Sequence, residues 1–248
     1  MTKTALITGV TAGFGEAAAL KFAGEGWRVI GTGRRGDRLR ALGEKLGDKF
    51  LGLEIDMRDR EAVESLGKLE ADWGEVDLLV NNAGLAPPMG GIEATDWDKI
   101  ETALDTNITG LVALTRALIP ALVRRKGAII NLSSVAATYP YKGGAVYAGT
   151  KAFVRQFSLD LRCDLAGTGV RVTSIEPGMA ETEFTIVRTG GDRDASDRLY
   201  AGANPMTSED LADLFWWIAN LPHHLNINAI ELMPVSQSWA GFTVEREA

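Results

Sequence analysis

Short apolar runs rich in β-branched residues recur along the chain, and longer stretches with apolar residues at every third or fourth position lie between them. The first pattern is typical of buried strands, and the second is typical of helices that bury one face. Seven strands are predicted, at residues 4–8, 28–32, 50–55, 77–81, 128–132, 170–175 and 227–233. Because strands that alternate with helices pair in parallel, we expect an α/β fold of the doubly wound kind, a seven-stranded and mainly parallel sheet with helices on both faces.

The length of the chain fits one domain over residues 1–248. With 46% hydrophobic residues it can bury one sizeable core, and no repeat, linker or low-complexity tract divides it. The polar, glycine-containing stretch 188–197 is interpreted as a loop, within a substrate lid over about residues 183–205. A C-terminal tail over about residues 234–248 follows the last strand.

Charge and cysteine content exclude several classes of partner. A net charge of -7 disfavours binding to a nucleic-acid backbone, which needs a large basic face. The single cysteine, Cys163, leaves no internal disulfide and no ligand cluster for a metal, so a reducing, cytoplasmic location is expected and no metal site. The chain starts without a secretory signal. Its most apolar helical stretch, 111–123, contains Arg116 and is shorter than the roughly 20 residues of a membrane span.

Two predicted helices have more apolar surface than one contact can bury. The helix at 111–123 is apolar almost all round, and the helix at 145–165 has a second apolar stripe through Phe153 and Phe157. A helix buried on two sides needs two partners. One is the sheet, and the other is either a neighbouring subunit, which predicts a homotetramer or a dimer, or another part of the same chain.

A glycine-rich turn separates the first strand from the first helix. Three glycines at such a turn allow a tight bend, close approach of the backbone to a pyrophosphate, and close packing of the helix, whose N-terminus favours an anion. The position of the turn indicates a Rossmann-type dinucleotide site rather than an ordinary loop. Its candidate cofactor-binding residues are Gly9, Val10, Thr11, Ala12, Gly13, Phe14 and Gly15.

The end of the second strand indicates which dinucleotide is bound. Arg34 and Arg35 stand where an acidic residue would accept a hydrogen bond from a free 2′-hydroxyl. Two guanidinium groups suit a 2′-phosphate instead, which favours NADP(H) over NAD(H). The alternative is a solvated basic turn in which Asp37 caps the next helix.

Two further strand ends supply candidate cofactor contacts. Asp56, followed by Met57, ends the third strand and can accept from an adenine amino group, although a strand-end turn or helix cap explains it almost as well. The fourth strand ends at the carboxyl edge where open sheets bind ligands, although asparagine next to glycine also simply forms turns. The residues at that end are Asn82, Ala83 and Gly84.

The strongest chemical signal is Tyr147 followed four residues later by Lys151. This spacing places the phenol and the ammonium on one helical face. An adjacent ammonium favours phenolate, so the Tyr147 pKa is expected to fall from about 10 toward neutral pH, which suits an acid or base. Ser134, just past the fifth strand, can hydrogen-bond the substrate oxygen.

These motifs resemble the short-chain dehydrogenase/reductase family over the whole chain. The resemblance implies that Tyr147 is the acid/base, that Ser134 polarises the substrate oxygen, and that Lys151 also binds the nicotinamide ribose. It adds Asn107, whose backbone carbonyl would hold a water linking the lysine to solvent. That region is rich in poor helix formers, although an ordinary helix end explains them too. The resemblance also implies nicotinamide contacts from Pro177, Gly178, Met179 and Thr182.

Longer blocks, such as the stretch from Tyr147 to Arg162, resemble a subgroup of that family, the bacterial NADP-dependent 3-hydroxy acid dehydrogenases acting on serine, allo-threonine and malonic semialdehyde. A small anionic or zwitterionic substrate follows from the resemblance. A carboxylate needs a cation, and the lid carries Arg188, the preferred candidate, and Arg193. In this subgroup the tail contributes to subunit contacts near the pocket, and packing on its own subunit is the alternative.

The leading hypothesis is therefore hydride transfer between NADP(H) and a small 3-hydroxy or 3-oxo acid or semialdehyde. A reductase of another small aldehyde or ketone, such as sulfoacetaldehyde, is the close alternative, because a sulfonate can use the same arginine. A redox sensor that holds NADPH without turnover is a third hypothesis. Against it stand Ser134, Asn107, Tyr147 and Lys151, because a pure binder has no need of acid/base residues.

Overall fold

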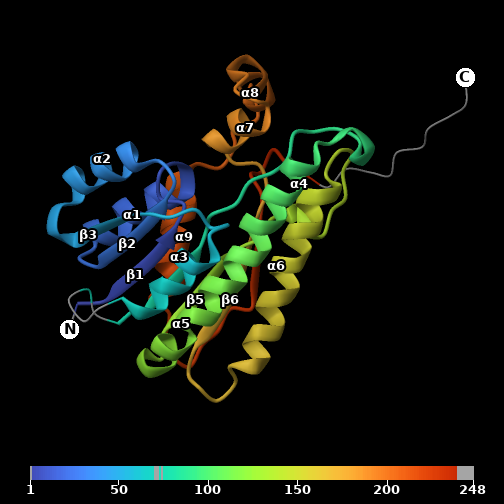
Figure 1. Ribbon diagram of the computed structural model, residues 1–248. Coiled ribbons are helices and arrows are strands. Elements are labelled where there is room, and N and C mark those ends of the chain that lie inside the picture. Colours follow the sequence, from blue (N-terminus) through green and yellow to red (C-terminus); the bar gives the residue numbers. More distant parts are fainter. Residues whose placement is uncertain (1, 70–72, 74, 239–248) are drawn as a thin grey trace, which may run out of the picture.

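The computed structural model describes residues 2–69, 73 and 75–238, and its centre is one parallel β-sheet (Figure 1). The strand order is β3-β2-β1-β4-β5-β6-β7, and every described strand pair is parallel. The predicted doubly wound sheet is confirmed, with strand ends displaced by at most two residues. The strands are β1 (Thr4–Thr8), β2 (Arg28–Gly33), β3 (Phe50–Glu54), β4 (Leu78–Asn81), β5 (Ala128–Leu132), β6 (Arg171–Pro177) and β7 (Ala229–Leu232).

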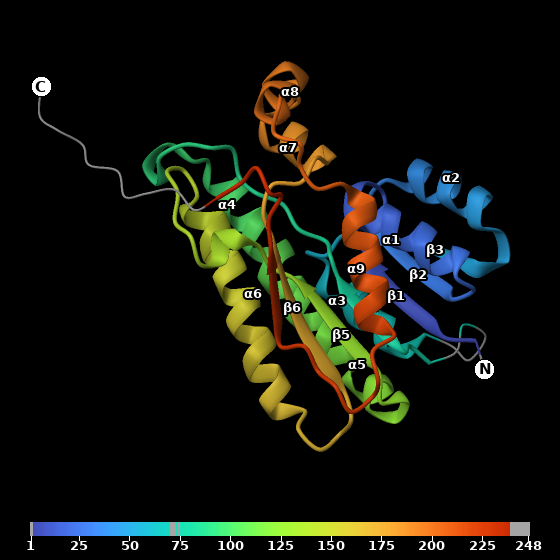
Figure 2. The same cartoon turned by 180° about the vertical axis from the view of Figure 1, so that it is seen from behind.

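Helices cover both faces of this sheet, as Figures 1 and 2 show from opposite sides. One face carries α1 (Gly13–Gly24), α2 (Gly36–Leu46) and α9 (Ser208–Ala219). The other face carries α3 (Arg60–Ser65), α5 (Leu111–Arg125) and α6 (Ala145–Asp164), with α4 (Trp97–Leu104) leading into α5. Two short helices, α7 (Glu183–Arg188) and α8 (Arg193–Tyr200), project beyond the carboxyl ends of the strands.

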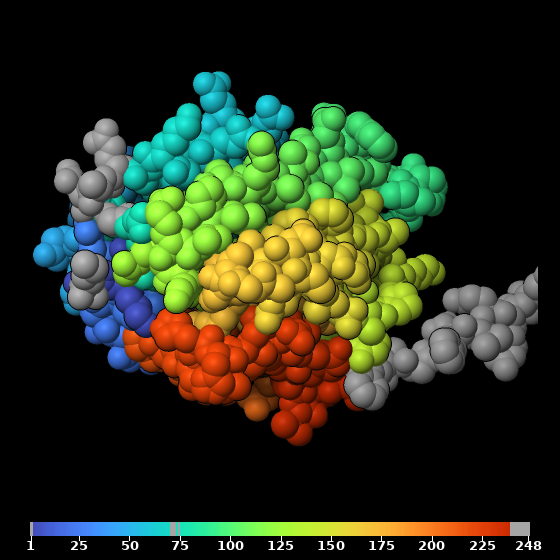
Figure 3. Space-filling model, turned by 90° about the horizontal axis from the view of Figure 1, so that it is seen from below, coloured from blue at the N-terminus to red at the C-terminus, as the bar shows by residue number. Residues whose placement is uncertain are grey.

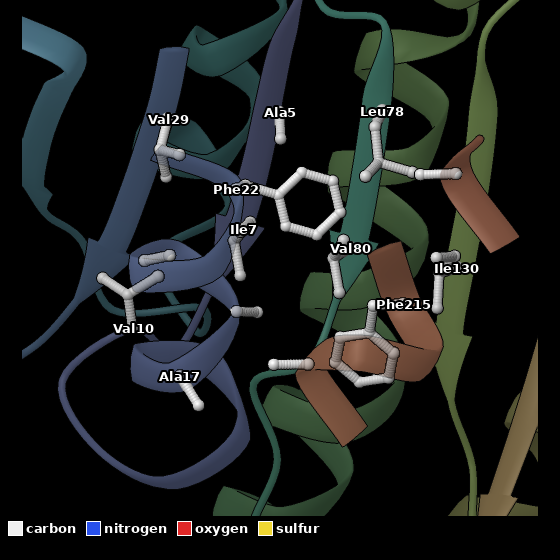
Figure 4. Packing of buried hydrophobic residues seen from close by; sticks show 14 of the residues in the cluster. Ala5, Ile7, Val10, Ala17, Phe22, Val29, Leu78, Val80, Ile130 and Phe215 are labelled. Atoms are coloured by element: carbon white, nitrogen blue, oxygen red, sulfur yellow. The ribbon is translucent and has the colours of Figure 1, made fainter. Parts of the chain in front are cut away.

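The core on the α1 side forms because small residues let the helices approach the sheet. Ala18 and Ala19 of α1 are fully buried, and Phe22 and Phe215, from α1 and α9, lie over the strands among Ile7, Val80 and Ile130 (Figure 4). Full burial of a large apolar side chain is worth about 1.5–3 kcal/mol. This packing fixes the first helix, and with it the glycine turn, against the first strand.

The helix that begins at Trp97 is much longer than the apolar stretch 111–123 suggested. A π-helical turn, Asp105–Gly110, joins α4 to α5, so the helix runs unbroken to Arg125. By length and composition it is able to cross a membrane, but half of its most apolar window is buried inside the protein. Burial of this kind is typical of a helix that packs on a sheet.

The interpretation of residues 188–197 as a loop is wrong in part. Only a short connection separates the two lid helices, with Gly190 and Gly191 at φ of +71° and +99°. Helix α8 then starts after Asp192, whose side chain accepts a hydrogen bond from the Ala195 amide. The aspartate cap satisfies a free amide at the helix start and outweighs the polar, glycine-containing composition that suggested a loop.

Candidate active site

A cleft of about 1650 Å³ opens at the carboxyl ends of the strands, beside the point where the strand order reverses between β1 and β4. Most of the residues predicted to bind cofactor or substrate line it. Three do not: Val10 packs in the core, Gly15 is buried beneath the glycine turn, and Asn107 lies behind the cleft wall. The predicted residues along the cleft are Gly9, Thr11, Ala12, Gly13, Phe14, Arg34, Arg35, Asp56, Met57, Asn82, Ala83, Gly84, Ser134, Tyr147, Lys151, Pro177, Gly178, Met179, Thr182 and Arg188.

The glycine turn has the geometry of a phosphate cradle. Gly9 and Gly13 adopt φ of +74° and +57°, which a side chain would strain. A Cβ on Gly15 would lie 2.3 Å from the Gly9 carbonyl oxygen, so only glycine lets α1 start this close to the turn. Asn82 braces the turn by donating to the Thr8 carbonyl oxygen over 2.7 Å. The turn therefore fits a dinucleotide pyrophosphate at the N-terminus of α1.

Basic residues line the cleft where β2 ends, and one of them, Arg35, is hydrogen-bonded to other side chains of the protein. Arg35 donates from Nε to Thr11 Oγ1 over 3.1 Å, and from a terminal nitrogen to Glu183 over 2.9 Å. Arg38, one turn further on, bonds to the same Glu183 carboxylate. Arg34 is exposed and leaves its guanidinium available to a 2′-phosphate.

Asp56 lines the cleft at the end of β3, and its carboxylate pairs with Arg58 over 2.7 Å. Hydrogen bonds from Arg58 lower the pKa of Asp56 and keep it charged. The second oxygen also accepts from the Arg58 backbone amide, which makes Asp56 a turn residue as well as a cleft residue. Asp56 therefore forms the strand-end turn, and its place in the cleft lining is compatible with a contact to the adenine.

Ser134, Tyr147 and Lys151 come together at the inner end of the cleft. Ser134 is the second residue after β5, and Tyr147 and Lys151 share one face of α6, as their spacing predicted. Lys151 is buried and donates from Nζ to the Leu132 carbonyl oxygen over 2.7 Å. Its ammonium lies 5.7 Å from the centre of the Tyr147 ring, and hydrogen bonding links the tyrosine to Ser134.

The expected fall in the Tyr147 pKa is not found. Burial raises the pKa of Tyr147 to about 12, against smaller lowering effects of Ser134 and Arg188. Burial also lowers the pKa of Lys151 to about 8. Lys151 Nζ bonds to a carbonyl of β5 rather than to the phenol, so its charge does not offset the effect of burial on the Tyr147 pKa. Tyr147 is therefore a protonated phenol that can donate at neutral pH.

Asn107 occupies the π-helical turn, so the alternative of an ordinary helix end is excluded. Its side-chain oxygen accepts from the Leu85 amide over 2.9 Å, and its amide donates to the Leu85 carbonyl over 2.8 Å and to Thr150 Oγ1 over 3.0 Å. Gly84 fills the space between Asn107 and the lysine, because a Cβ there would lie 3.4 Å from Lys151 Nζ. The turn thus ties three neighbouring segments together behind the reacting groups.

The lid brings one of its two candidate arginines to the site. Arg188 donates to the Tyr141 hydroxyl over 2.9 Å, and its guanidinium carbon lies 5.4 Å from the Tyr141 ring centre and 5.6 Å from that of Tyr147. Its Nε is buried and without a hydrogen-bond partner among the described residues. Arg193 is exposed at the start of α8 and does not line the cleft.

The segment after β6 brings together the residues that resemblance linked to the nicotinamide. Thr182 caps α7 and lies against the glycine turn, within 3.4 Å of a Cβ built on Gly13. Gln237, in the C-terminal tail, accepts a hydrogen bond at its side-chain oxygen from the Met179 amide over 2.6 Å. The described part of the tail therefore packs on its own subunit, and Trp239 and Phe242 lie outside the described residues.

Sequence reasoning missed Arg38 and Glu183. The signal was weak, because Glu183 is one acidic residue at the start of a lid whose partner lies 145 positions earlier. Across residues 2–69, 73 and 75–238 there is no group of three histidine, cysteine or acidic side chains that is able to hold a metal ion.

Comparisons with known proteins agree with this geometry. Residues 3–190 match the family model described as short chain dehydrogenase. The chain is 57% identical to a serine 3-dehydrogenase of Agrobacterium fabrum, with all of both chains covered. It is 50% identical to an NADP-dependent 3-hydroxy acid dehydrogenase of Salmonella typhi, covering 97% of this chain and 98% of that one. The closed form of a serine dehydrogenase complexed with NADP+ superposes with a TM-score of 0.95 at 48% identity, covering 98% of this chain and 100% of that one. The chain belongs to the short-chain dehydrogenase/reductase family.

Proposed function

We propose that this protein is an NADP(H)-dependent oxidoreductase that interconverts a small 3-hydroxy acid with the matching 3-oxo acid or semialdehyde. The observation that carries the proposal is the position of the half-buried Tyr147 phenol, between Ser134 and Arg188 at the inner end of a dinucleotide-sized cleft. Similarity to a serine 3-dehydrogenase and to an NADP-dependent 3-hydroxy acid dehydrogenase supports the same chemistry.

The cofactor would lie along the cleft, and the residues there fit it. The glycine turn would hold the pyrophosphate, Arg34 and Arg35 the 2′-phosphate, and the segment from Pro177 to Thr182 the nicotinamide end. When bound, NADPH supplies the hydride that reduces a carbonyl carbon, and NADP+ takes it back from an alcohol. The side chains of the protein supply the proton and orient the substrate.

In the direction of reduction, Tyr147 donates its phenolic proton to the substrate oxygen as the carbon is reduced, so the alcohol leaves with one added hydride and one added proton. Ser134 hydrogen-bonds the same oxygen and holds the carbonyl in place. Charged Lys151 stabilises the phenolate that remains until a proton returns to it. In oxidation the phenolate accepts the hydroxyl proton.

Arg188 is proposed as the group that holds the substrate carboxylate. Its unpartnered, buried Nε and its position beside Tyr147 would place an anion a few bonds from the reacting carbon. A charge-assisted hydrogen bond of this kind is stronger than a neutral one and selects short acids. Arg193, exposed and away from the cleft, is not used in this proposal.

A sulfonate is the second candidate anion, because its negatively charged oxygens can also accept hydrogen bonds from the Arg188 guanidinium. Reduction of sulfoacetaldehyde would then use the same Ser134 and Tyr147. A pure NADPH sensor is disfavoured, since it has no use for a half-buried phenol and a buried cation at the nicotinamide end of the cleft.

A direct assay decides among these functions. Consumption of NADPH is followed by absorbance with a panel of semialdehydes, sulfoacetaldehyde and simple ketones. Formation of NADPH from NADP+ is followed with serine, allo-threonine and 3-hydroxypropionate. The proposal expects turnover of the carboxylates, lost in Arg188→Gln and kept in the matched control Arg193→Gln. Turnover of sulfoacetaldehyde alone would favour the second candidate, and binding without any turnover would favour the sensor.

The outer face of α6 is the candidate surface for contact between subunits. In Figure 3 the yellow atoms of α6 lie between the green atoms of α5 and the red atoms of the last helix and strand. Phe153 on this side is 38% exposed and stacks on Phe157, and Trp97 is 67% exposed. We propose that this surface joins subunits in a homotetramer or a dimer of a cytoplasmic protein, which light scattering of the purified chain tests directly.

A further inference from the structure

The lid is tied to the opposite wall of the cofactor cleft by an ion-pair cluster formed by Glu183, Arg35 and Arg38. The two arginines donate to the Glu183 carboxylate over 2.8 to 2.9 Å. Both also donate to the Thr11 carbonyl oxygen over 3.0 Å, which anchors them to the glycine turn. Their hydrogen bonds lower the pKa of Glu183 and keep it charged at neutral pH.

The position of this cluster gives it a consequence for the cofactor. Glu183 is the first residue of α7, directly after Thr182, and it lines the cleft together with Thr11 and Arg35. The cluster therefore joins the two walls of the cleft between the basic end at β2 and the nicotinamide end at Thr182. A dinucleotide that runs from one end to the other must pass this connection to enter or leave.

The rest of the lid is connected so that the tie acts on it as a unit. The Tyr200 hydroxyl of α8 bonds to Thr185 of α7 and donates to the Ala180 carbonyl oxygen at the base of the lid over 2.9 Å. On the substrate side, Arg188 bonds to Tyr141. The lid is thus fixed on both sides, and the cofactor side depends on Glu183.

We propose that Glu183 and Arg38 are positioning residues that close the lid over the dinucleotide and set the rate of cofactor exchange. Arg35 serves both the tie and the cofactor site, whereas Arg38 lies outside the cleft lining and bonds only to Glu183 and to the Thr11 carbonyl oxygen among the contacts described for it. The inference rests on the proposed use of the cleft for NADP(H) and adds a gate to it. Because the three side chains are about 40% exposed, the tie is weak enough to open within a catalytic cycle.

The test measures release of the cofactor by stopped-flow fluorescence, with NADPH or NADH displaced by excess oxidised cofactor. Glu183→Gln and Arg38→Ala are each expected to speed release about threefold to tenfold, as loss of an exposed ion-pair cluster implies. For Arg38→Ala the fold-change should be the same for NADPH and NADH, because Arg38 acts on the lid and not on the 2′-phosphate. The double variant should be no faster than Glu183→Gln alone, because loss of the Glu183 carboxylate already breaks the bonds to both arginines.

Two matched variants control for charge. Glu181→Gln removes an exposed carboxylate two residues before the tie, and Arg40→Ala removes an exposed guanidinium from the same helix as Arg38. Both should leave release unchanged. A release rate in Glu183→Gln equal to that of Glu181→Gln would overturn the inference, and so would an Arg38→Ala effect confined to NADPH, which would make Arg38 a phosphate contact instead.

A second measurement needs no cofactor. Trypsin should cut the lid, after Arg188, Arg193 or Arg198, several times faster in cofactor-free Glu183→Gln than in the parent protein and Glu181→Gln. Equal cutting rates would show that the tie does not hold the lid. Failure of the substrate panel would overturn the proposed reaction while leaving both of these measurements interpretable.

Discussion

The side-chain amide of Asn107 donates to Thr150 Oγ1 over 3.0 Å and so joins the π-helical turn to the helix that carries Tyr147 and Lys151. Asn107→Leu should remove this bond and leave the part-buried amide and carbonyl of Leu85 without their Asn107 partner. We expect a loss of about 1–3 kcal/mol in the free energy of unfolding, measured by urea denaturation, and a lower kcat. Thr109→Ala, an exposed change in the same turn, should stay within about 0.5 kcal/mol. Equal stabilities of the two variants would contradict this account.

Removal of the Tyr147 hydroxyl should abolish proton donation without preventing NADPH from binding in the cleft. Tyr147→Phe is expected to cost about 10² to 10⁴ in turnover while the dissociation constant for NADPH changes little. Turnover by absorbance and binding by fluorescence titration check both halves. Tyr139→Phe removes a phenol from the same cleft lining and should lose far less activity. Near-normal turnover in Tyr147→Phe would refute the acid role.

The buried Lys151 should make stability depend on pH. Its pKa is about 8 in the folded protein and 10.5 in the unfolded chain, so between these values the unfolded chain binds more protons. Stability from this group therefore rises with pH from about 8 to about 10.5, by about 3 kcal/mol in all, and the cost of the buried cation is fully present below pH 8. Tyr147, with a pKa raised from 10.0 to about 12, adds stability that is lost as the pH rises from 10 to 12.

Urea denaturation of the parent protein and of Lys151→Met across the window from pH 7 to pH 10 isolates the lysine. The free-energy difference between them should shift in favour of the parent as the pH rises. A difference that is flat across this window would show that the ammonium is not destabilised by burial.

The two arginines at the end of β2 should select the phosphorylated cofactor. Replacing both Arg34 and Arg35 by Ser is expected to weaken NADPH binding by about 100-fold or more and NADH binding much less, since each of the two bonds to a charged group contributes about 1.5–3 kcal/mol. Glu183→Gln controls for the part of the effect that comes from the broken tie. An unchanged ratio of the dissociation constants for NADPH and NADH would show that Arg34 and Arg35 do not bind the 2′-phosphate.

Tyr141 should matter through the arginine that it orients. Tyr141→Phe removes the bond to Arg188 and is expected to raise KM for a carboxylate substrate about threefold to tenfold, with kcat less affected. Arg188→Lys keeps the charge but loses the planar donor set, so it should also raise KM. If neutral ketones show the same rise in KM as carboxylates, Arg188 is not an anion contact.

The sequence was informative wherever the signal is local. Strands and their alternation with helices follow from residue periodicity, and the face shared by Tyr147 and Lys151 follows from helix geometry. The glycine turn was equally predictable from the sequence. A side chain at Gly9 or Gly13 would strain the backbone, and a side chain at Gly15 would collide with the turn.

Contacts between distant segments were not predictable in the same way. Nothing near Glu183 indicates that it bonds to Arg38, and nothing near Arg188 points to Tyr141, 47 residues away. The pKa of Tyr147 was predicted in the wrong direction because spacing gives the neighbour but not the burial or the competing Leu132 carbonyl. Tertiary packing determines both the contacts between distant segments and the pKa of Tyr147.

The π-helical turn also sets the rotational register of the long helix. Its hydrogen bonds span one residue more than those of an α-helix, and each residue of an α-helix turns the chain by about 100°. Ile100 and Ala103 before the turn and Leu114 and Leu118 after it are all buried. If Asp105–Gly110 formed regular α-helix without a change in length, the α4 side chains would rotate by roughly 100° relative to those of α5. The π conformation of this segment therefore determines which face of α4 is buried.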